Sequence, residues 1–250
     1  MRDRINVYHS LFRNILLDEV NMCGRYTLST PIELLQKRFL FKISPLSYVV
    51  NYNIAPSEPV LTITGNGVNT GQYMKWGLIP SWSKNSSMGS KMINARAETL
   101  GERPSFRGAI RTNRCLIIAD SFYEWRNVRG KKIPFRIMLE NNQPFAFAGL
   151  WARWNDFTGN SVLSCTIITT NPNSLIKPVH KRMPVILPAQ AEKIWLDPQI
   201  QDTEMLSNIL VPYPSNEMRV YEVSKLVNSP KNNFPELIKE IGYSSYYDQC

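Results

Sequence analysis

Cys23 directly follows an internal methionine, Met22, in the stretch Met-Cys-Gly-Arg-Tyr. A chain that starts at Met22 and loses that methionine presents a free α-amine and a thiol on one residue. The amine titrates near pH ~8 and the thiol near ~8.5, so both are appreciably nucleophilic at neutral pH. Arg25 lies two residues further on and favours the thiolate over the thiol. A lone cysteine is more often a small buried hydrophobe, so this chemistry needs support from other residues.

Glu124 and His180 are the candidate proton-transfer groups. Glu124 lies between Tyr123 and Trp125 at the end of an apolar run, where a carboxylate is expected to hold its proton more tightly than in water. That property suits a general acid or base. The alternative for Glu124 is an ion pair with one of the many arginines. His180, with Lys and Arg beside it, is the only histidine after His9, although a single histidine is usually structural or simply exposed.

Asn94 and Arg96 would share one face if their segment were extended. Asparagine can bind an oxygen without a change of charge, and arginine can pair with a phosphate through two N–H groups. Aromatic and cationic residues alternate around them, which is typical of a surface where bases stack between phosphate contacts. Tryptophans beside Pro and Gly are equally common in a core, so that alternative stays open. The residues of this pattern are Trp76, Trp82, Tyr123, Lys75, Lys91 and Arg96.

The charge of the chain is concentrated in the segment that carries these residues. The net charge is +9, and residues 22–190 carry 21 basic and 8 acidic side chains, whereas residues 191–250 carry 5 and 9. A basic excess of this kind indicates a polyanionic partner such as nucleic acid. A merely soluble basic surface is the alternative.

The four cysteines are far apart and form no Cys-x-x-Cys pair, and there are only two histidines. This pattern predicts neither a disulfide framework nor a metal site, so we expect no metal, no cofactor and a reducing compartment. No apolar run approaches the roughly 18 residues of a membrane span, and residues 1–21 lack the continuous apolar core of a secretory signal. We expect no membrane partner and a cytoplasmic protein, associated with the nucleoid when it is engaged on DNA.

The predicted elements form a β-rich α+β domain without internal repeats or linkers. Residues 53–56 predict a turn, residues 65–67 a hairpin turn, residues 94–99 a helix, and residues 134–139 and 145–154 the two strands of one hairpin. The other predicted strands cover residues 23–27, 59–64, 115–119, 162–169 and 185–187, and the other predicted helices cover residues 31–40, 189–196 and 235–241. We expect one domain over residues 22–250, behind a leader of residues 1–21.

Five motifs occur together in a fixed order: Met-Cys-Gly-Arg-Tyr, Trp-Gly-Leu-Ile-Pro-Ser-Trp, Asn-Ala-Arg-Ala-Glu-Thr, Phe-Tyr-Glu-Trp and His-Lys-Arg-Met-Pro. Together they resemble the SOS response-associated peptidase (SRAP) family, the abasic-site processing proteins, from Met22 to about Leu187. The resemblance implies a single domain whose mainly antiparallel strands form a barrel-like sheet with flanking helices. Residues 1–21 have no counterpart in the family pattern.

The resemblance also implies a covalent sensor of abasic sites in single-stranded DNA, acting in the DNA damage response. By their positions in the motifs, the implied catalytic residues are Cys23, Asn94, Glu124 and His180, and the implied DNA contacts are Arg25, Trp76, Arg96 and Arg182. A lyase action on the strand and peptidase processing of the chain's own leader belong to the same expectation.

The chemistry of Cys23 agrees with this assignment. The aldehyde of an abasic deoxyribose would form a Schiff base with the α-amine of Cys23, and the thiolate would close a five-membered thiazolidine on the same carbon. If translation starts at Met1 and the leader stays, the nitrogen of Cys23 is an amide and cannot react. We therefore expect the functional chain to start at Cys23, after a start at Met22 or after self-cleavage.

Two other functions fit some of these residues. A cysteine peptidase would use Cys23 with His180, although an N-terminal nucleophile in a strongly basic segment suits DNA better than peptide. A non-covalent single-strand binding module would use only the tryptophans and arginines. Protein partners cannot be derived from the sequence.

Overall fold

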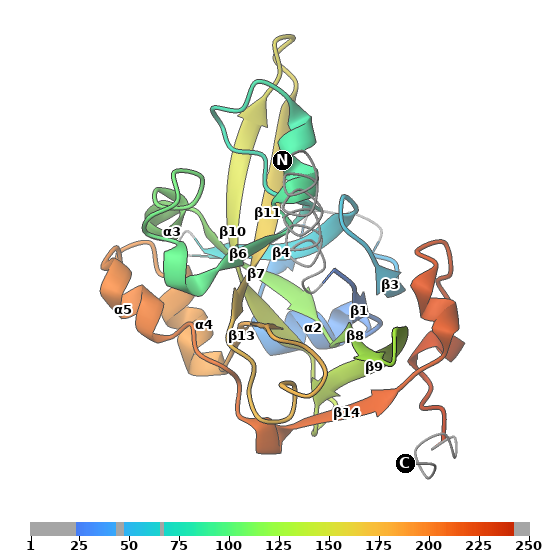
Figure 1. The fold of residues 1–250 in the computed structure, drawn as a ribbon. Coiled ribbons are helices and arrows are strands. Elements are labelled where there is room, and N and C mark those ends of the chain that lie inside the picture. The colour runs from blue at the N-terminus through green and yellow to red at the C-terminus, as the bar shows by residue number, and fades with distance from the viewer. Residues whose placement is uncertain (1–23, 44–47, 66–67, 243–250) are drawn as a thin grey trace, which may run out of the picture.

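Two sheets form the body of the protein in the computed structural model, which describes residues 24–43, 48–65 and 68–242 (Figure 1). Five strands form the smaller sheet, in the order β14 (Met218–Glu222), β9 (Lys131–Leu139), β8 (Ser121–Val128), β1 (Tyr26–Leu28) and β3 (Asn51–Ile54). The pairs that the structure gives within this sheet are antiparallel. β1 therefore lies between β8 and β3, which places the start of the described chain in the interior of a sheet.

The larger sheet closes on itself into a barrel. Its strands, in order, are β12 (Met183–Pro184), β11 (Ser161–Thr170), β10 (Phe145–Asn155), β7 (Arg114–Ala119), β4 (Pro59–Gly65), β5 (Asn69–Trp76) and β2 (Lys42–Ile43), with β13 (Ile186–Leu187) on β10 and β6 (Asn94–Arg96) on β11. A parallel pairing between β11 and β5, with Cys165 opposite Trp76, joins the strands β11, β10, β7, β4 and β5 into a ring. The predicted β-rich domain with a barrel-like sheet is confirmed.

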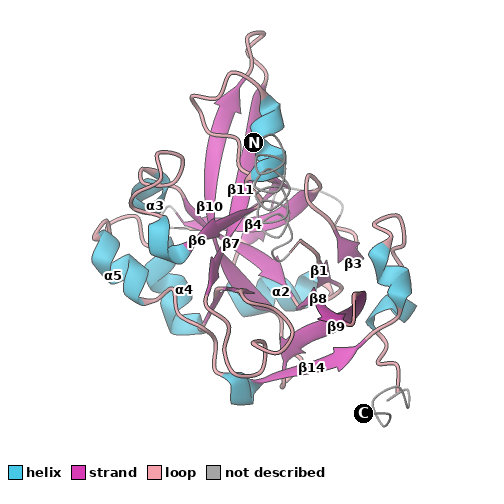
Figure 2. Cartoon of the chain, viewed as in Figure 1, coloured by secondary structure: helices cyan, strands magenta, loops and turns pink. Residues whose placement is uncertain are grey.

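Helices lie around the outside of the sheets (Figure 2). They are α2 (Ile32–Phe39), α3 (Ala109–Thr112), α4 (Ala189–Leu196) and α5 (Thr203–Asn208), with 3-10 helices η1 (Ser86–Lys91), η2 (Ala97–Thr99), η3 (Ser215–Glu217), η4 (Lys225–Asn228) and η5 (Pro235–Ile238). In α2 the buried residues Leu35 and Phe39 are four positions apart and face the core, as the apolar spacing predicts. None of the described helices is long and apolar enough to cross a membrane.

Aromatic side chains fill the interface between the two sheets. Tyr26 of β1 meets Trp76 of β5 edge-on, with ring centroids 5.3 Å apart, and Phe147 of β10 at 5.7 Å. Phe122 of β8 meets the same Phe147 at 6.0 Å. Edge-to-face pairs of this kind add about 0.5–1.5 kcal/mol beyond the area they bury. The smaller sheet, which carries β1 and β8, is thereby packed firmly onto the barrel.

Two glycines allow close backbone approaches in the barrel. Gly77 directly follows β5, has a φ of 128°, and a Cβ there would lie 2.5 Å from the carbonyl oxygen of Gly89. At Gly149 of β10 a Cβ would lie 2.8 Å from the Ile117 side chain and 2.9 Å from the Cys115 sulfur. A side chain at either position would require its neighbours to shift.

The prediction that residues 134–139 and 145–154 form one hairpin is wrong. β9 pairs with β8 across the turn at Arg129 and Gly130, whereas β10 pairs with β7, β11 and β13 in the other sheet. The edge of β9 that β10 would have used is paired with β14 from the C-terminal part of the chain. The loop between β9 and β10 therefore connects the two sheets.

Three smaller predictions also need correction. Residues 94–99 form strand β6 followed by the short η2 instead of a helix, because β6 pairs in parallel with β11. Asn53 lies in strand β3, where residues 53–56 predicted a turn. The helix predicted over residues 235–241 is the single 3-10 turn η5. The prediction for residues 1–21 lies outside the described residues.

Candidate active site

The described chain begins one residue after Cys23, which itself lies outside the described residues. Pairing between β1 and β8 sets Tyr26 opposite Phe122 and Thr27 opposite Ser121. The backbone N–H of Tyr123 donates to the carbonyl oxygen of Arg25 at 2.9 Å, which extends this pairing beyond the first residue of β1. Glu124 is the next residue on β8, so the chain that leads to Cys23 runs beside Glu124.

Asp120 fixes the other end of β1. Its carboxylate accepts the backbone N–H groups of Ser29 and Thr30, at 2.6 and 2.9 Å, and their hydroxyl groups, both at 3.0 Å. It also accepts the hydroxyl of Thr27. A carboxylate with several such donors is a rigid anchor. Sequence reasoning missed Asp120, although an acidic residue directly after the apolar run 115–119 was a signal for it.

Glu124 and His180 meet at the end of this strand pair. The Glu124 side chain is 3% exposed and the His180 side chain 15%, and Oε1 of Glu124 lies 3.9 Å from Nδ1 of His180. Nδ1 also lies 3.0 Å from the carbonyl oxygen and 3.2 Å from the backbone nitrogen of Arg182. The tautomer of the ring decides which of these contacts is a hydrogen bond. The structure thus brings together two predicted proton-transfer groups from distant parts of the sequence.

His180 is held by a structured loop between β11 and β12. The backbone N–H of His180 donates to the carbonyl oxygen of Ile176 at 2.9 Å. Asn173 accepts the N–H of Ile176 at 3.0 Å and donates to the carbonyl oxygen of Tyr213 at 2.7 Å. These contacts give the imidazole a defined position opposite Glu124.

Arg182 ties this loop to η2. Its guanidinium forms a two-point ion pair with Glu98, with distances of 2.7 and 2.8 Å, and donates to the carbonyl oxygen of Thr169 at 2.7 Å. The Arg182 side chain is only 12% exposed. The hydrogen bond from Arg182 lowers the pKa of the Glu98 carboxyl below its ordinary value. Arg182 therefore has a structural role beside the implied DNA contact.

We expect the Glu98→Gln variant to lose stability at neutral pH by about 0.2–1 kcal/mol, the size of a partly exposed ion pair. Because the folded-state pKa of Glu98 is lowered, the contribution is complete above the ordinary glutamate pKa and is lost as the pH falls through the lowered value. The difference in Tm from wild type should shrink across that acidic range. Glu102→Gln, at an exposed carboxylate nearby, is the control, and an equal Tm difference at every pH would contradict the role of the pair.

Asn94 begins β6, and Trp76 connects this strand to β1. Asn94 lies opposite Ile167 of β11, and the exposed Arg96 lies opposite Thr169. The Trp76 indole N–H donates to the carbonyl oxygen of Ile93 at 2.9 Å, while its ring packs on Tyr26. The segment from Asn94 to Arg96 is extended, so these two residues, which are two positions apart, lie on the same face of the strand.

The burial of Trp76 does not fit the DNA contact that the resemblance implies for it. Trp76 is 1% exposed and Tyr123 is 0% exposed, so neither ring has a face that a base can reach. Trp82, by contrast, is 59% exposed. Two tryptophans six residues apart therefore differ completely in exposure, because β5 buries the first and the loop that follows exposes the second.

Arg25 is half-buried and held on one side. Its Nη1 donates to Oδ1 of Asn53 and to the carbonyl oxygen of Val227, both at 2.8 Å. The guanidinium lies 5.9 Å from the centre of the Trp125 ring, a cation–π distance. Burial lowers the pKa of Arg25, although arginine remains charged in proteins.

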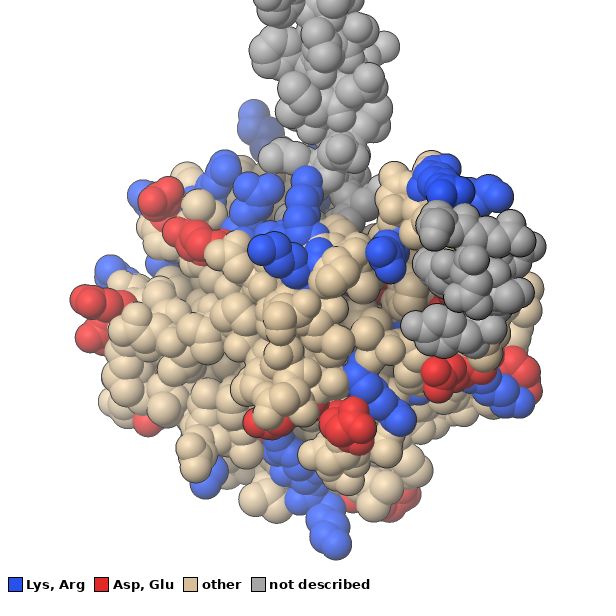
Figure 3. Space-filling model, turned by 60° about the horizontal axis from the view of Figure 1, so that its bottom comes forward, with Lys and Arg blue, Asp and Glu red and all other residues tan. Residues whose placement is uncertain are grey.

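Basic side chains gather on one face of the molecule. Lys and Arg predominate in the upper part of the face shown in Figure 3, and Asp and Glu lie more to its sides and below. Residues 75–97 carry four basic and no acidic side chains. The exposed basic residues that flank Asn94 and His180 in sequence are Lys84, Lys91, Arg96 and Lys181.

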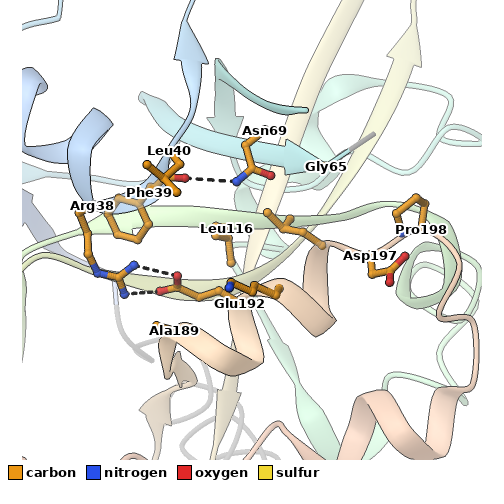
Figure 4. A pocket seen from close by; sticks show the side chains of 12 residues that line it. Arg38, Phe39, Leu40, Gly65, Asn69, Leu116, Ala189, Glu192, Asp197 and Pro198 are labelled. Atoms are coloured by element: carbon orange, nitrogen blue, oxygen red, sulfur yellow. Dashed lines mark hydrogen bonds and ion pairs between the residues drawn. The ribbon is translucent and has the colours of Figure 1, made fainter. Parts of the chain in front are cut away.

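A cavity of about 420 Å³ lies elsewhere, between α2 and α4 (Figure 4). Across it Arg38 makes a two-point ion pair with Glu192, at 2.7 and 3.0 Å. None of the predicted site residues lines this cavity. No cluster of three potential metal ligands is found within the described part of the chain.

A protein-family model matches most of this chain. The family model for SOS response associated peptidase (SRAP) matches residues 22–230. The chain belongs to this family.

Its relatives include three with informative names. It is 50% identical to "Abasic site processing protein YoqW" of Bacillus subtilis (strain 168) over 222 residues, which cover 87% of this chain and 99% of that protein. It is 47% identical to "Abasic site processing protein YoaM" of the same strain over 221 residues, 87% of this chain and 97% of the relative. With "Abasic site processing protein HMCES" of Gallus gallus it shares 31% identity over 193 residues, 67% of this chain and 56% of that protein.

A solved structure shows the same fold. The crystal structure of a protein from Bacteroides thetaiotaomicron is similar to this chain with a TM-score of 0.79 and 28% identity, over 88% of this chain and 100% of that one. A Bordetella bronchiseptica protein gives a TM-score of 0.71 at 27% identity, over 81% of this chain and 100% of that one.

Proposed function

We propose that this protein recognises an abasic site in single-stranded DNA and becomes covalently linked to it through Cys23. The observation that carries the proposal is the pair of the buried Glu124 and the partly buried His180, 3.9 Å apart, beside the strand that leads to Cys23. Cys23 is bonded to Gly24, so its Cα lies about 3.8 Å from that of Gly24. The names of the relatives, which process abasic sites, support the same assignment.

The proposed reaction has two steps. The α-amine of Cys23 adds to the aldehyde of the ring-opened sugar, and the adduct loses one water to form a Schiff base. The sulfur then adds to the same carbon, the thiol proton passes to the nitrogen, and a thiazolidine results. Since both nucleophiles belong to one residue, ring closure has an effective molarity of up to ~10⁵–10⁸ M.

The neighbouring residues have distinct tasks in this reaction. Glu124 opens the sugar and supplies the proton that leaves with water, which requires a carboxyl group beside the amine. His180 stabilises the sugar oxygen, and Asn94 holds the reacting end of the nucleotide. Arg25 and Arg96 contact phosphates, while Arg182 positions the loop of His180 through its bonds to Glu98 and to the carbonyl oxygen of Thr169.

The proposal is tested with a chain that starts at Cys23 and a single strand that carries one abasic site. We expect a species that survives denaturing electrophoresis, and we expect Cys23→Ala to lose that species while binding is retained. A wild-type chain that binds but gives no such species would favour the non-covalent binding module. Cleavage of peptides by the same chain, abolished in Cys23→Ala, would favour the peptidase.

Trp82 is the aromatic residue that we expect to stack on a base. Its replacement by alanine should weaken binding of single-stranded DNA by about 1–3 kcal/mol, the contribution of one stacked base. Trp76→Phe keeps a buried ring and loses one hydrogen bond to Ile93, so it should lower the free energy of unfolding by about 1–3 kcal/mol and leave affinity unchanged. Fluorescence anisotropy and urea denaturation measure the two effects, and the reverse pattern would contradict the assignment.

A further inference from the structure

The Arg25 guanidinium is only partly used by the protein. Nη1 is engaged by Asn53 and by the Val227 carbonyl oxygen, as described above. Nε of Arg25 is buried and has no hydrogen-bond partner among the described residues. Buried donors are nearly always paired, so an unpaired Nε indicates a place for an oxygen ligand. The guanidinium thus has Nη1 held by the protein and Nε without a partner among the described residues.

Asn53 determines which edge is fixed. It is 1% exposed, and its Nδ2 donates to three carbonyl oxygens, those of Ser229 at 2.9 Å, Asn232 at 2.8 Å and Val227 at 3.3 Å. Carbonyl oxygens can face only the NH₂ side of an amide, so the orientation of this amide is determined. Its Oδ1 must then point at Nη1 of Arg25. A fixed acceptor of this kind selects one rotamer of the arginine.

The three carbonyl oxygens belong to residues 225–233, which we call the C-terminal segment. In Figure 1 this part of the chain lies beside β3 and β9. Asn228 accepts the indole N–H of Trp125 at 2.7 Å, and Asn233 accepts the backbone N–H of Tyr52 at 2.8 Å. Beneath it, Val227 packs with Tyr123, Val223 and Leu237 in a small apolar cluster. The C-terminal segment is therefore fixed in place beside Arg25.

We propose that Asn53 is a positioning residue, which anchors Arg25 to the C-terminal segment so that the Nε edge of the guanidinium receives a phosphate of the DNA single strand. This inference rests on the proposed function, since it takes the DNA backbone as the ligand. A guanidinium edge with two N–H groups matches a phosphate in geometry and charge. Asn53 touches neither the DNA nor the reacting atoms and acts only through Arg25.

The test measures how non-covalent binding depends on salt. Cys23→Ala is the background, which prevents crosslinking, and the probe is a single strand with a tetrahydrofuran analogue of the abasic site. Each neutralised phosphate contributes about 0.7 to the slope of log Kobs against log salt. We expect Arg25→Ala to reduce the slope by about 0.7, Asn53→Ala to reduce it by the same amount, and the double variant to show no further loss.

The slope separates positioning from a merely structural role. Asn53 carries no charge, so its replacement can change the slope only by displacing a charged group. Asn69→Ala is the control, because Asn69 is another asparagine whose side chain bonds a carbonyl oxygen, that of Phe39, beside the remote cavity. It should leave the slope unchanged. If Asn53→Ala does not fold, Asn53→Ser, which keeps a hydroxyl donor, takes its place.

Three results would overturn the inference: an unchanged slope in the Asn53 variant, a reduction that adds to that of Arg25→Ala, or an unchanged slope in Arg25→Ala itself. None of these depends on crosslinking, which is measured separately with the wild-type chain. A failure of the covalent proposal would leave the slopes as expected, so the two failures are distinguishable.

Discussion

A chain that begins at Cys23 is expected to form a stable adduct with an abasic site, and Cys23→Ser at the same start is expected to form only a reversible one. The serine variant keeps the α-amine, so the Schiff base can form, but it lacks the sulfur that closes the thiazolidine. Its adduct should survive denaturing electrophoresis only after borohydride reduction. The expected loss of unreduced product is essentially complete, because the variant lacks an intramolecular ring closure whose effective molarity reaches up to ~10⁵–10⁸ M.

A second variant, the counterpart of Cys23→Ser, retains the sulfur of Cys23 and blocks its amine. A chain with one additional, N-acetylated residue before Cys23 has an amide nitrogen at Cys23 and no free α-amine, so it should give no adduct with or without borohydride. Together the two variants separate the two nucleophiles. Stable crosslinking by the serine variant would show that the sulfur is dispensable, and crosslinking by the extended chain would show that the amine is dispensable.

Glu124→Gln is expected to slow crosslinking by about 10²–10⁴-fold, the usual contribution of a general acid or base. Glutamine has nearly the same shape as glutamate but cannot exchange a proton, so DNA affinity should stay close to wild type. The measurement is the single-turnover rate of crosslink formation at saturating DNA. Glu140→Gln, at an exposed position after β9, is the control. A Glu124→Gln rate within a fewfold of wild type would contradict the proposed role.

The order of motifs along the sequence predicted the family correctly, and the fold followed from it. Local patterns also located several elements well, because each is decided by nearby residues. The helix over residues 189–196 is α4, and the apolar run 115–119 lies in the fully buried strand β7. Both depend on continuous or periodic apolar side chains, which are visible in one sequence.

Pairings between distant segments could not be derived in this way. The barrel closes through a parallel pairing of β11 with β5, and residues 161–170 contain no local sign of this partner. The incorrect hairpin has the same cause, since the edge of β9 is taken by β14 from far along the chain. Asn53 was predicted to lie in a turn. The carbonyl oxygens that bind its amide come from residues 227–232, so the residues near Asn53 give no sign of them.

The site itself was partly predictable. Glu124 and His180 were identified from their motifs, and the structure shows what the motifs alone could not, that they meet at 3.9 Å. The sequence left open whether Trp76 lies in the core or at the surface, because aromatic residues beside Pro and Gly occur equally in both, and only the family resemblance implied a DNA contact. Asp120 and Asn53 were missed because their importance lies in backbone groups that only the folded chain brings to them.

The most direct test of the covalent proposal is the intact mass of the product formed by the chain that starts at Cys23 and a single strand with one abasic site. The proposed reaction predicts one species whose mass is that of protein plus DNA minus one water, with peptide mapping that places the link on Cys23. A product linked at any other residue, or no covalent product at all, would contradict it.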